Sequence, residues 1–219
     1  MNYGPKLATD GLVLCLDAAD VNSYPRTGTS WSDVSGNGNN GTLTNGPTFN
    51  SSNGGSIVFD GVDDCVLVNS NANILSKTAY TKTAWFYTTS FGTNNNIISG
   101  GNSGQHAFWL GASSYLRAGH NGNWSTVVTT TSMSLNTWYY GAVTFNTSTG
   151  WILYLNGIQE TTSSDTTTFT GNQEILIGAY STAGNVYTGR IATSLVYNRV
   201  LTSTEILQNY NATKSRFGL

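Results

Sequence analysis

The carboxylate side chains are the first candidates for chemistry, because two of them held close together could hydrolyse a glycosidic bond. Such cleavage requires two carboxyl groups about 5 to 9.5 Å apart. The three glutamates, Glu160, Glu174 and Glu205, are far apart in the sequence, and none has an aspartate two residues away. We therefore predict that the chain is not a glycosidase and not an enzyme.

A cluster of aspartates could instead bind a metal ion. Asp60, Asp63 and Asp64 place three carboxylates within five residues, in a sequence typical of a tight turn. Three such charges repel one another unless a cation, backbone N–H groups or water compensate them. We predict a structural calcium site at these three residues. The alternative is that Asp60 only caps the turn.

Asp33 is a further candidate ligand, from a separate segment of the chain. The sequence Asp33-x-Ser35-x-Asn37-Gly38 is similar to the first half of a calcium-binding loop. The twelfth position of that loop would be Thr44, where an EF-hand requires a bidentate glutamate. An EF-hand is therefore excluded, and Asp33 remains a predicted ligand only in combination with the aspartate cluster.

The remaining reactive side chains give no recognisable site. His106, His120, Cys15 and Cys65 lack the spacing of a zinc site. We expect the histidines at the surface or at an interface, and the cysteines as buried thiols, because both cysteines lie in apolar, strand-like segments. The segment 36–41 formally matches G-x-G-x-x-G, but it lacks the preceding strand and following helix that a nucleotide site needs.

Trp124 is the strongest candidate for binding a ligand. It ends a Gly- and Asn-rich segment, 119–124, which we predict to be a loop. A flat aromatic ring flanked by amides is typical of sugar recognition, because the ring stacks on the apolar sugar face and the amides bond to hydroxyls. The alternative is that Trp124 pins the loop in place. The predicted glycan-binding residues are Trp124, His120, Asn121, Asn123, Tyr115 and Arg117.

The other tryptophans have a different expected role. Those in strand-like sequence are predicted to lie in the core, since a β-sandwich interior is built from such residues. They are Trp85, Trp109, Trp138 and Trp151.

A β-hairpin is the clearest structural element. Asn156-Gly157 is typical of a type I′ turn, so residues 151–155 and 158–162 are predicted to pair as antiparallel strands. A third strand, 140–145, precedes them. Apolar side chains alternate on both faces of the first arm, so the hairpin needs cover on both sides.

Most of the remaining chain also consists of short strand-like segments separated by turn residues, which indicates one all-β domain over residues 1–219. Residues 20–49 are predicted to form a long loop held by Trp31. A capping box, Thr202 to Glu205, predicts a single short helix near the C-terminus.

Composition excludes several partners. Charged residues make up 9% of the chain and the formal net charge is −2, with no cluster of Lys or Arg. We therefore expect neither nucleic acid nor membrane as a partner. The first residues lack the charged and apolar regions of a secretory signal, so we expect no export by a signal peptide.

Several segments together resemble the concanavalin A-like lectin/glucanase superfamily, in its laminin-G-like jelly-roll branch, over almost the whole chain. They are G-L-V-L-C-L-D from Gly11, D-V-S-G-N-G-N-N-G-T from Asp33, F-D-G-V-D-D from Phe59, W-Y-Y-G-A-V-T-F from Trp138, L-Y-L-N-G from Leu153 and G-R-I-A-T-S-L-V-Y-N-R-V-L-T from Gly189.

The resemblance implies an all-β fold, a two-sheet antiparallel β-sandwich of the jelly-roll type with one short C-terminal helix. Its concave face would bind carbohydrate or protein, often with a structural calcium nearby. Glucanases of this superfamily resemble one another in a strand with the motif Glu-x-Asp-x-x-Glu, which is absent here. The absence agrees with the prediction of a non-enzymatic module.

The start, Y-G-P-K, and the end, N-Y-N-A-T-K-S-R-F-G-L, resemble copies of this domain in virion proteins of tailed bacteriophages. This resemblance implies a virion surface protein, made in the host cytoplasm, that binds host-surface glycans and other virion proteins. The alternative is a purely structural capsid decoration or tail or fibre component. Because the strand-like segments carry few of the charges that protect sheet edges, we expect a homo-oligomer.

Overall fold

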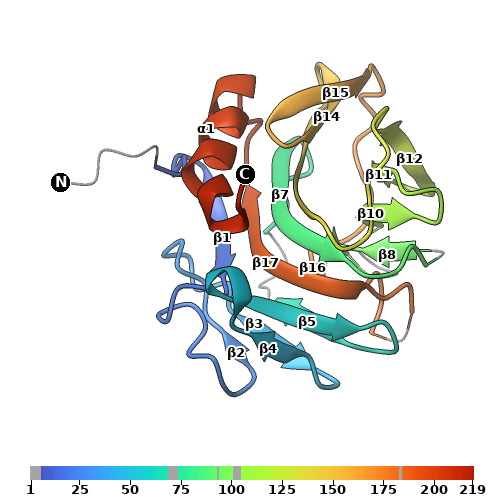
Figure 1. Ribbon diagram of the computed structural model, residues 1–219. Coiled ribbons are helices and arrows are strands. Elements are labelled where there is room, and N and C mark those ends of the chain that lie inside the picture. Colours follow the sequence, from blue (N-terminus) through green and yellow to red (C-terminus); the bar gives the residue numbers. More distant parts are fainter. Residues whose placement is uncertain (1–5, 69–73, 93, 101–104, 183) are drawn as a thin grey trace.

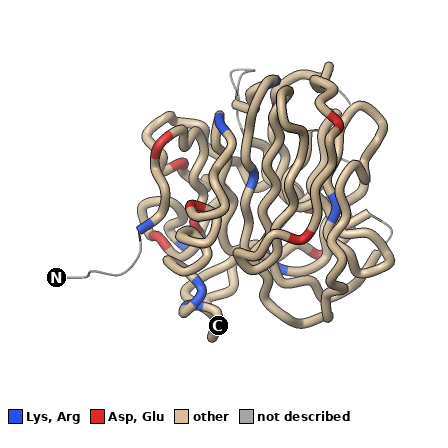
Figure 2. Tube along the Cα trace, turned by 90° about the horizontal axis from the view of Figure 1, so that it is seen from above, with Lys and Arg blue, Asp and Glu red and all other residues tan. Residues whose placement is uncertain are grey.

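A computed structural model describes residues 6–68, 74–92, 94–100, 105–182 and 184–219. The chain forms antiparallel sheets in two layers with one α-helix, which confirms the predicted all-β sandwich with a short C-terminal helix (Figure 1). Lys and Arg are spread over the molecule rather than gathered into a patch (Figure 2). Among the described residues, no helix has the length and apolar character needed to cross a membrane.

The first layer is an eight-stranded sheet in the order β15-β14-β13-β7-β17-β5-β4, with β1 also paired to β17. Its strands are β1 (Leu12–Asp17), β4 (Thr48–Asn50), β5 (Ser56–Asp60), β7 (Ala79–Thr88), β13 (Trp138–Asn146), β14 (Gly150–Leu155), β15 (Ile158–Ser163) and β17 (Thr188–Tyr197).

The second layer consists of two short sheets, β2-β3-β6-β16-β9 and β12-β11-β10-β8. Residues 94–99 join them, because β8 pairs with β10 while β9 pairs with β16. The strands are β2 (Ser30–Trp31), β3 (Gly41–Thr44), β6 (Cys65–Val68), β8 (Asn94–Asn96), β9 (Ile98–Ser99), β10 (His106–Gly111), β11 (Leu116–His120), β12 (Asn123–Val128) and β16 (Ile175–Ile177).

The predicted hairpin is confirmed. Asn156 and Gly157 both have positive φ, 51° and 81°, as a type I′ turn requires. Leu155 pairs with Ile158, and β13 pairs with β14 on one side and with β7 on the other. The hairpin therefore belongs to the large sheet, as the sequence predicts.

One prediction near the N-terminal end needs correction. The segment 20–49 is not one long loop, because it contains β2, β3 and part of β4, although Trp31 is fully buried as expected. The turn at 60–64 carries the chain from β5 in the first layer to β6 in the second. Cys15 and Cys65 are buried free thiols, as predicted.

The main core lies between the two layers. Phe86 of β7, Phe108 of β10, Phe145 of β13 and Trp151 of β14 are at most 1% exposed there. Because side chains alternate along a strand, each of these strands also sends residues to its other face. That other face must be covered or must meet solvent.

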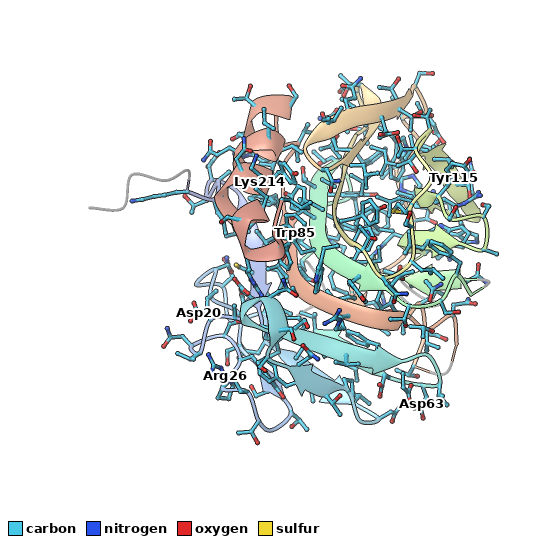
Figure 3. All side chains as sticks on the ribbon, in the orientation of Figure 1. Asp20, Arg26, Asp63, Trp85, Tyr115 and Lys214 are labelled. Carbon is cyan, nitrogen blue, oxygen red and sulfur yellow. The ribbon has the colours of Figure 1, made fainter. Side chains whose placement is uncertain are left out.

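A second core covers the outer face of the large sheet. Helix α1 (Ser203–Thr213) and the 3₁₀-helix η2 (Lys214–Phe217) lie beside β1, β7 and β17 (Figures 1 and 3). Trp85 of β7 stacks on Phe217, with ring centroids 4.1 Å apart, and its Nε1 donates to Thr213 Oγ1 at 2.7 Å. The capping box predicted at Thr202 is present and begins the helix.

Lys82 is an unusual member of the main core, being only 1% exposed. Its Nζ lies 2.7 Å from His106 Nδ1 and 3.3 Å from the Ile98 carbonyl oxygen. Since His106 Nε2 lies 2.9 Å from the Glu174 carbonyl oxygen, which can only accept, Nε2 carries the proton and Nδ1 accepts from the lysine. No carboxylate among the described residues pairs with Lys82.

Burial lowers the pKa of Lys82 well below its ordinary value. It also lowers the pKa of His106, with the Lys82 charge acting in the same direction. A neutral amine has two N–H groups, and the two acceptors at Lys82 match them. His106 is therefore a core residue, which corrects the expected surface position.

We expect the pH dependence of stability to reveal the neutral lysine. Unfolded Lys82, with a pKa of about 10.4, binds a proton that the folded amine lacks, so the free energy of unfolding should rise with pH across this window. Between pH 7 and 8.5 the rise is up to about 2 kcal/mol in urea unfolding. The thiols of unfolded Cys15 and Cys65, with a pKa of about 8.5, ionise in the upper part of this window and oppose the rise, so the contribution of Lys82 is taken from a comparison with a variant that keeps both cysteines.

Lys82→Met, which keeps the side-chain length but removes the amine, should lose this rise whatever its absolute stability. Equal pH dependence in the two proteins would show that Lys82 is charged in the folded state.

Candidate functional site

A pocket of about 180 Å³ opens on the outer face of the second layer. It is formed by strands β8, β10 and β12 and by the connection between β16 and β17. In β10 the buried core residue Phe108 faces inward, so alternation turns its neighbours toward the pocket. The lining residues are Asn94, Asn96, Ala107, Trp109, Trp124, Tyr180 and Asn185.

Three aromatic side chains form the apolar part of the pocket. The rings of Trp124 and Tyr180 meet edge to face, with centroids 5.3 Å apart. Trp109 Nε1 donates to the backbone carbonyl of Trp124 at 2.7 Å, which fixes the two indole-bearing strands relative to each other. All three residues are only partly buried, so their rings remain accessible to a ligand.

A bulge in the β11–β12 hairpin positions Trp124. The register changes between Ala118, which pairs with Val127, and His120, which pairs with Asn123, so β12 contains extra residues opposite Gly119. A Cβ at Gly119 would collide with the backbone of Asn123 and Trp124. Bulges redirect side chains next to functional sites. Gly119 thus allows the close approach that turns Trp124 toward the pocket.

Three asparagines form the polar part of the pocket. Asn96 is buried, and both atoms of its side-chain amide bond to other residues of the protein. Oδ1 accepts from Ser99 Oγ at 2.7 Å, and Nδ2 donates to the Asn185 carbonyl oxygen at 3.0 Å. Asn94 Nδ2 donates to Asn185 Oδ1 at 2.9 Å. Among the described residues, Asn94 Oδ1 and Asn185 Nδ2 have no partner and are available to a ligand.

Of the six residues predicted to bind glycan, only Trp124 lines this pocket. The segment 119–124 is not a loop, because Asn121 and Gly122, with φ of 54° and 87°, form the turn of a tight hairpin. Alternation in β11 therefore carries His120 into the core beside Trp151, with ring centroids 4.7 Å apart. Its Nε2 donates to the Thr167 carbonyl oxygen at 2.6 Å.

The amides of the hairpin turn are also outside the pocket. Asn121 holds a neighbouring segment, since its Nδ2 donates to the Thr168 carbonyl at 2.9 Å and its Oδ1 accepts from Thr170 N–H at 2.8 Å. Asn123 is exposed at the start of β12. Tyr115 precedes β11 and points away from the centre of the molecule (Figure 3).

Arg117 lies beside Trp109 on the same face of the sheet and is outside the pocket lining. It lies across from Trp109 in the β10–β11 pair, with its guanidinium carbon 5.5 Å from the centre of the indole. Its Nη1 donates to Ser125 Oγ at 3.2 Å and its Nη2 to Ser113 Oγ at 2.7 Å. The guanidinium therefore positions Trp109 rather than contacting the space that a ligand would fill.

Trp109, Tyr180 and the three asparagines were not among the predicted binding residues. Trp109 was expected in the core with the other strand tryptophans and instead faces outward. The run Asn94–Asn96 was an available signal, because amides are uncommon in an ordinary strand. No local pattern connects these residues with Tyr180 or Asn185.

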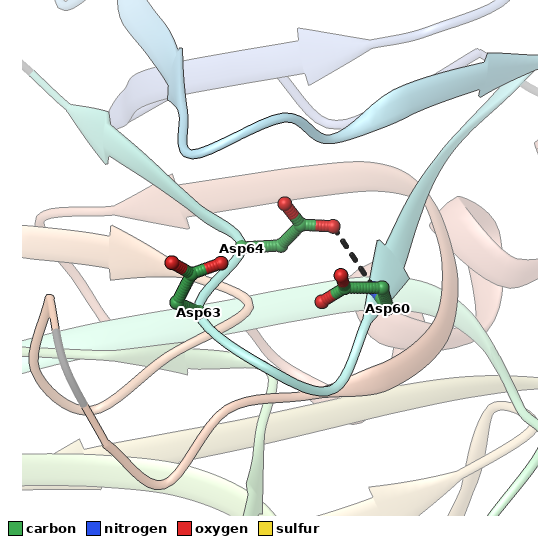
Figure 4. Close-up of side chains that lie close together, drawn as sticks. All are labelled: Asp60, Asp63 and Asp64. Carbon is green, nitrogen blue, oxygen red and sulfur yellow. Dashed lines mark hydrogen bonds between the residues drawn. The ribbon is translucent and has the colours of Figure 1, made fainter.

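The aspartate cluster lies at the β5–β6 connection, and the carboxylate oxygens of Asp60, Asp63 and Asp64 are within 4.8 Å of one another (Figure 4). Asp64 Oδ2 accepts the N–H of Asp60 at 2.9 Å, and Asp60 Oδ1 accepts that of Val62 at 2.8 Å. Burial raises the pKa of Asp64, and the charges of Asp60 and Asp63 add to the rise. Three hard oxygen donors fit calcium, which takes carboxylates, carbonyls and waters together.

Asp33 does not belong to this cluster. Its Oδ1 accepts from the N–H groups of Cys15, at 2.8 Å, and Ser35, at 2.9 Å. Its Oδ2 accepts from Ser35 Oγ and from Asn39 N–H at 2.9 Å. The carboxylate therefore ties its own segment to β1, and the prediction of Asp33 as a fourth ligand is wrong.

The chain belongs to the concanavalin A-like lectin/glucanases superfamily: the Laminin_G_3 family model matches residues 59–207. This confirms the resemblance of the sequence motifs. No curated protein matches the chain in sequence.

Solved structures of similar fold come from longer proteins. The chain is similar to the Trypanosoma rangeli sialidase in complex with the inhibitor DANA, with 16% identity and a TM-score of 0.73 over 96% of this chain and 34% of that one. The binding domain of Paraclostridial Mosquitocidal Protein 1 has 17% identity and a TM-score of 0.74 over 93% and 52%. The chain thus spans about a third and about a half of these two proteins.

A third structure matches in length. Domain 4 of AbnA, a GH43 extracellular arabinanase from Geobacillus stearothermophilus, in complex with arabinotriose, has 17% identity and a TM-score of 0.71, covering 91% of this chain and 98% of that one. At these identities the likeness shows the fold alone, a lectin-like jelly roll.

The aspartate cluster leads to a prediction about stability. We expect excess calcium to raise the melting temperature relative to chelator, because binding to the folded state alone adds about 3 kcal/mol at a hundredfold excess over Kd. Asp63→Asn should reduce the shift. Asp20 lies well away from Asp63 (Figure 3), so Asp20→Asn is the control and should show the same calcium-dependent shift as the wild-type protein. Identical melting curves in calcium and chelator would refute the site.

Proposed function

We propose that the chain is a non-catalytic glycan-binding module whose site is the pocket of Trp109, Trp124 and Tyr180. The observation that carries this proposal is the convergence of three accessible aromatic rings and unpaired amide atoms in one recess. An aromatic ring packs against the apolar C–H face of a sugar, and amides exchange hydrogen bonds with its hydroxyls. Both kinds of contact can form at once in this pocket.

The similar structures support the proposal as analogies. The arabinanase domain was solved with arabinotriose, and the mosquitocidal neighbour is described as a binding domain. A binding role also agrees with the membership of this chain in a lectin-containing superfamily.

The positions of the glutamates support a non-catalytic role. Glu160 accepts hydrogen bonds from the backbone N–H groups of Thr130 and Thr131, both at 3.0 Å. Glu205 caps α1 and pairs with Arg199 at 2.6 Å, which lowers the pKa of the carboxyl to about 2. None of the described residues that line the pocket carries a carboxylate.

We therefore expect no release of reducing sugar from any polysaccharide that the protein binds. Hydrolysis needs an acid and a second carboxylate beside the scissile bond, and the pocket offers neither. Reducing-end assays after long incubation with bound polymers provide the measurement. Turnover that disappears in a Glu174→Gln variant would overturn the non-catalytic assignment.

Trp124→Ala tests the proposed site directly. Because one accessible ring is lost, we expect binding to weaken by about 1–2 kcal/mol, or roughly fivefold to thirtyfold, in affinity electrophoresis on host-surface polysaccharide. Stability should fall by less than the roughly 3–5 kcal/mol of a buried tryptophan truncation. Tyr115→Ala, an aromatic truncation outside the pocket, is the matched control and should bind normally. Unchanged binding by the Trp124 variant would remove this pocket from consideration.

We also propose that the module is displayed on the virion of a tailed bacteriophage, made in the host cytoplasm, where it contacts other virion proteins and host-surface polysaccharide. Support for this comes from the sequence resemblance at both ends of the chain. We propose in addition that the protein forms a homo-oligomer, because its strands carry few of the charged residues that protect sheet edges from pairing. Mass spectrometry of purified particles and sedimentation of the isolated protein test these two points.

The purely structural alternative has one observation in its favour. Strand β15 lies at one end of the large sheet and begins with Ile158, which is 67% exposed. Such an edge suits stacking against another protein. Particles that carry Trp124→Ala separate the two functions: under the glycan-binding proposal they assemble normally but adsorb poorly to the host, whereas under the structural alternative adsorption is unchanged.

A further inference from the structure

Among the described residues, no side chain that lines the pocket is charged near neutral pH. Tyr180 is the only titratable one of these lining residues. Burial raises the pKa of the Tyr180 phenol, and the nearby Glu174 charge raises it further, so the phenol stays neutral. The Arg117 guanidinium lies against Trp109 and bonds to serine hydroxyls, and it does not line the pocket.

This arrangement disfavours an anionic sugar. A carboxylate entering the pocket would lose water without gaining a cationic partner, which is costly. The Glu174 charge that acts on Tyr180 would also repel it. An uncharged sugar meets neither penalty.

The two available amide atoms belong to one hydrogen-bonded pair. Asn94 Nδ2 donates to Asn185 Oδ1, which leaves Asn94 Oδ1 as an acceptor and Asn185 Nδ2 as a donor beside it. Asn96 holds the Asn185 backbone from below through its own Nδ2. The pair therefore presents one acceptor and one donor in a fixed relation.

Two adjacent hydroxyls on a sugar ring complement such a pair, because one hydroxyl can donate while its neighbour accepts. The volume of about 180 Å³ is smaller than the roughly 300–1,000 Å³ of sites for drug-sized ligands. It suits a single sugar ring held at its face by the aromatic walls.

We propose, building on the glycan-binding function above, that this pocket selects an uncharged sugar with a vicinal diol. One hydroxyl donates to Asn94 Oδ1 and the adjacent hydroxyl accepts from Asn185 Nδ2, while the ring packs against the indoles of Trp109 and Trp124. The two amides recognise the diol. Uronic and sialic acids are excluded because no described lining residue offers a positive charge to their carboxylates.

Matched polymers test both parts of the proposal with the wild-type protein. Long-chain 1,4-linked glucan and 1,5-linked arabinan have vicinal diols along the chain, whereas the internal residues of linear 1,3-linked glucan have none. Mild periodate cleaves vicinal diols and leaves the 1,3-linked chain intact. Polygalacturonate and its fully methyl-esterified form have the same diols but differ in charge. Retention on immobilised polymer is the readout.

We expect retention by at least one neutral diol-bearing polymer, its loss after periodate treatment, and none on the 1,3-linked glucan. We expect polygalacturonate to bind less than its ester, or neither to bind. Retention that survives periodate, or equal retention on the 1,3-linked glucan, would contradict the proposal that the pocket recognises a vicinal diol. Preference for polygalacturonate over its ester overturns the selection against charge. Retention by no polymer contradicts the proposed function itself.

A variant pair tests the assigned amide. Asn185→Asp replaces the donor Nδ2 by an acceptor oxygen with little change in shape, and aspartate tolerates the positive φ of 55° at this position. Retention on the preferred polymer should fall at least tenfold. Asn123→Asp adds the same charge at an exposed position outside the pocket and should bind as wild type.

The melting temperatures of both variants show whether either one folds poorly. If Asn185→Asp does, the periodate comparison with the wild-type protein tests the diol proposal in its place. Normal binding by a folded Asn185→Asp protein would overturn the role of this amide.

Discussion

The large sheet is apolar on both faces, and covering both of them determines the rest of the architecture. In β7, Phe86 faces the core between the layers, whereas Trp85 faces the opposite side. An antiparallel sheet in water usually leaves one face solvated. Here the second layer of strands covers the inner face, and α1 with η2 covers the outer one. The helix is therefore part of the core rather than an appendage.

With both faces of the large sheet covered, the outer face of the second layer carries the described pocket. The alternation that buries Phe108 exposes Trp109, and the bulge opposite Gly119 turns Trp124 toward it. Leaving aromatic surface in contact with water forgoes about 25 cal/mol of stabilisation for each Å². Three rings left accessible in one recess, beside amides held by Asn96, fit a site kept open for a ligand.

Rules that act over a few residues predicted the local elements but not the site. Asn156-Gly157 correctly predicts a hairpin. Asn121-Gly122 is the same dipeptide, but its segment was predicted as a loop, and the hairpin that it forms places His120 in a strand whose alternation turns the imidazole inward. Periodicity cannot say which face of a strand lies outside, so it assigns Trp109 to the core. Tyr180 comes from the connection between β16 and β17, which is distant in sequence from Trp124. Only the packing of the strands brings the rings of Trp124 and Tyr180 into one recess.

The indole N–H resonances of the protein give the most direct measurement of the central claim. Six tryptophans report on separate places, and only Trp109 and Trp124 line the pocket. Titration with a retained neutral oligosaccharide should shift or broaden these two resonances and leave those of the buried Trp31, Trp85 and Trp151 in place. Saturating sugar that moves neither pocket resonance, or that perturbs only the others, would contradict the account.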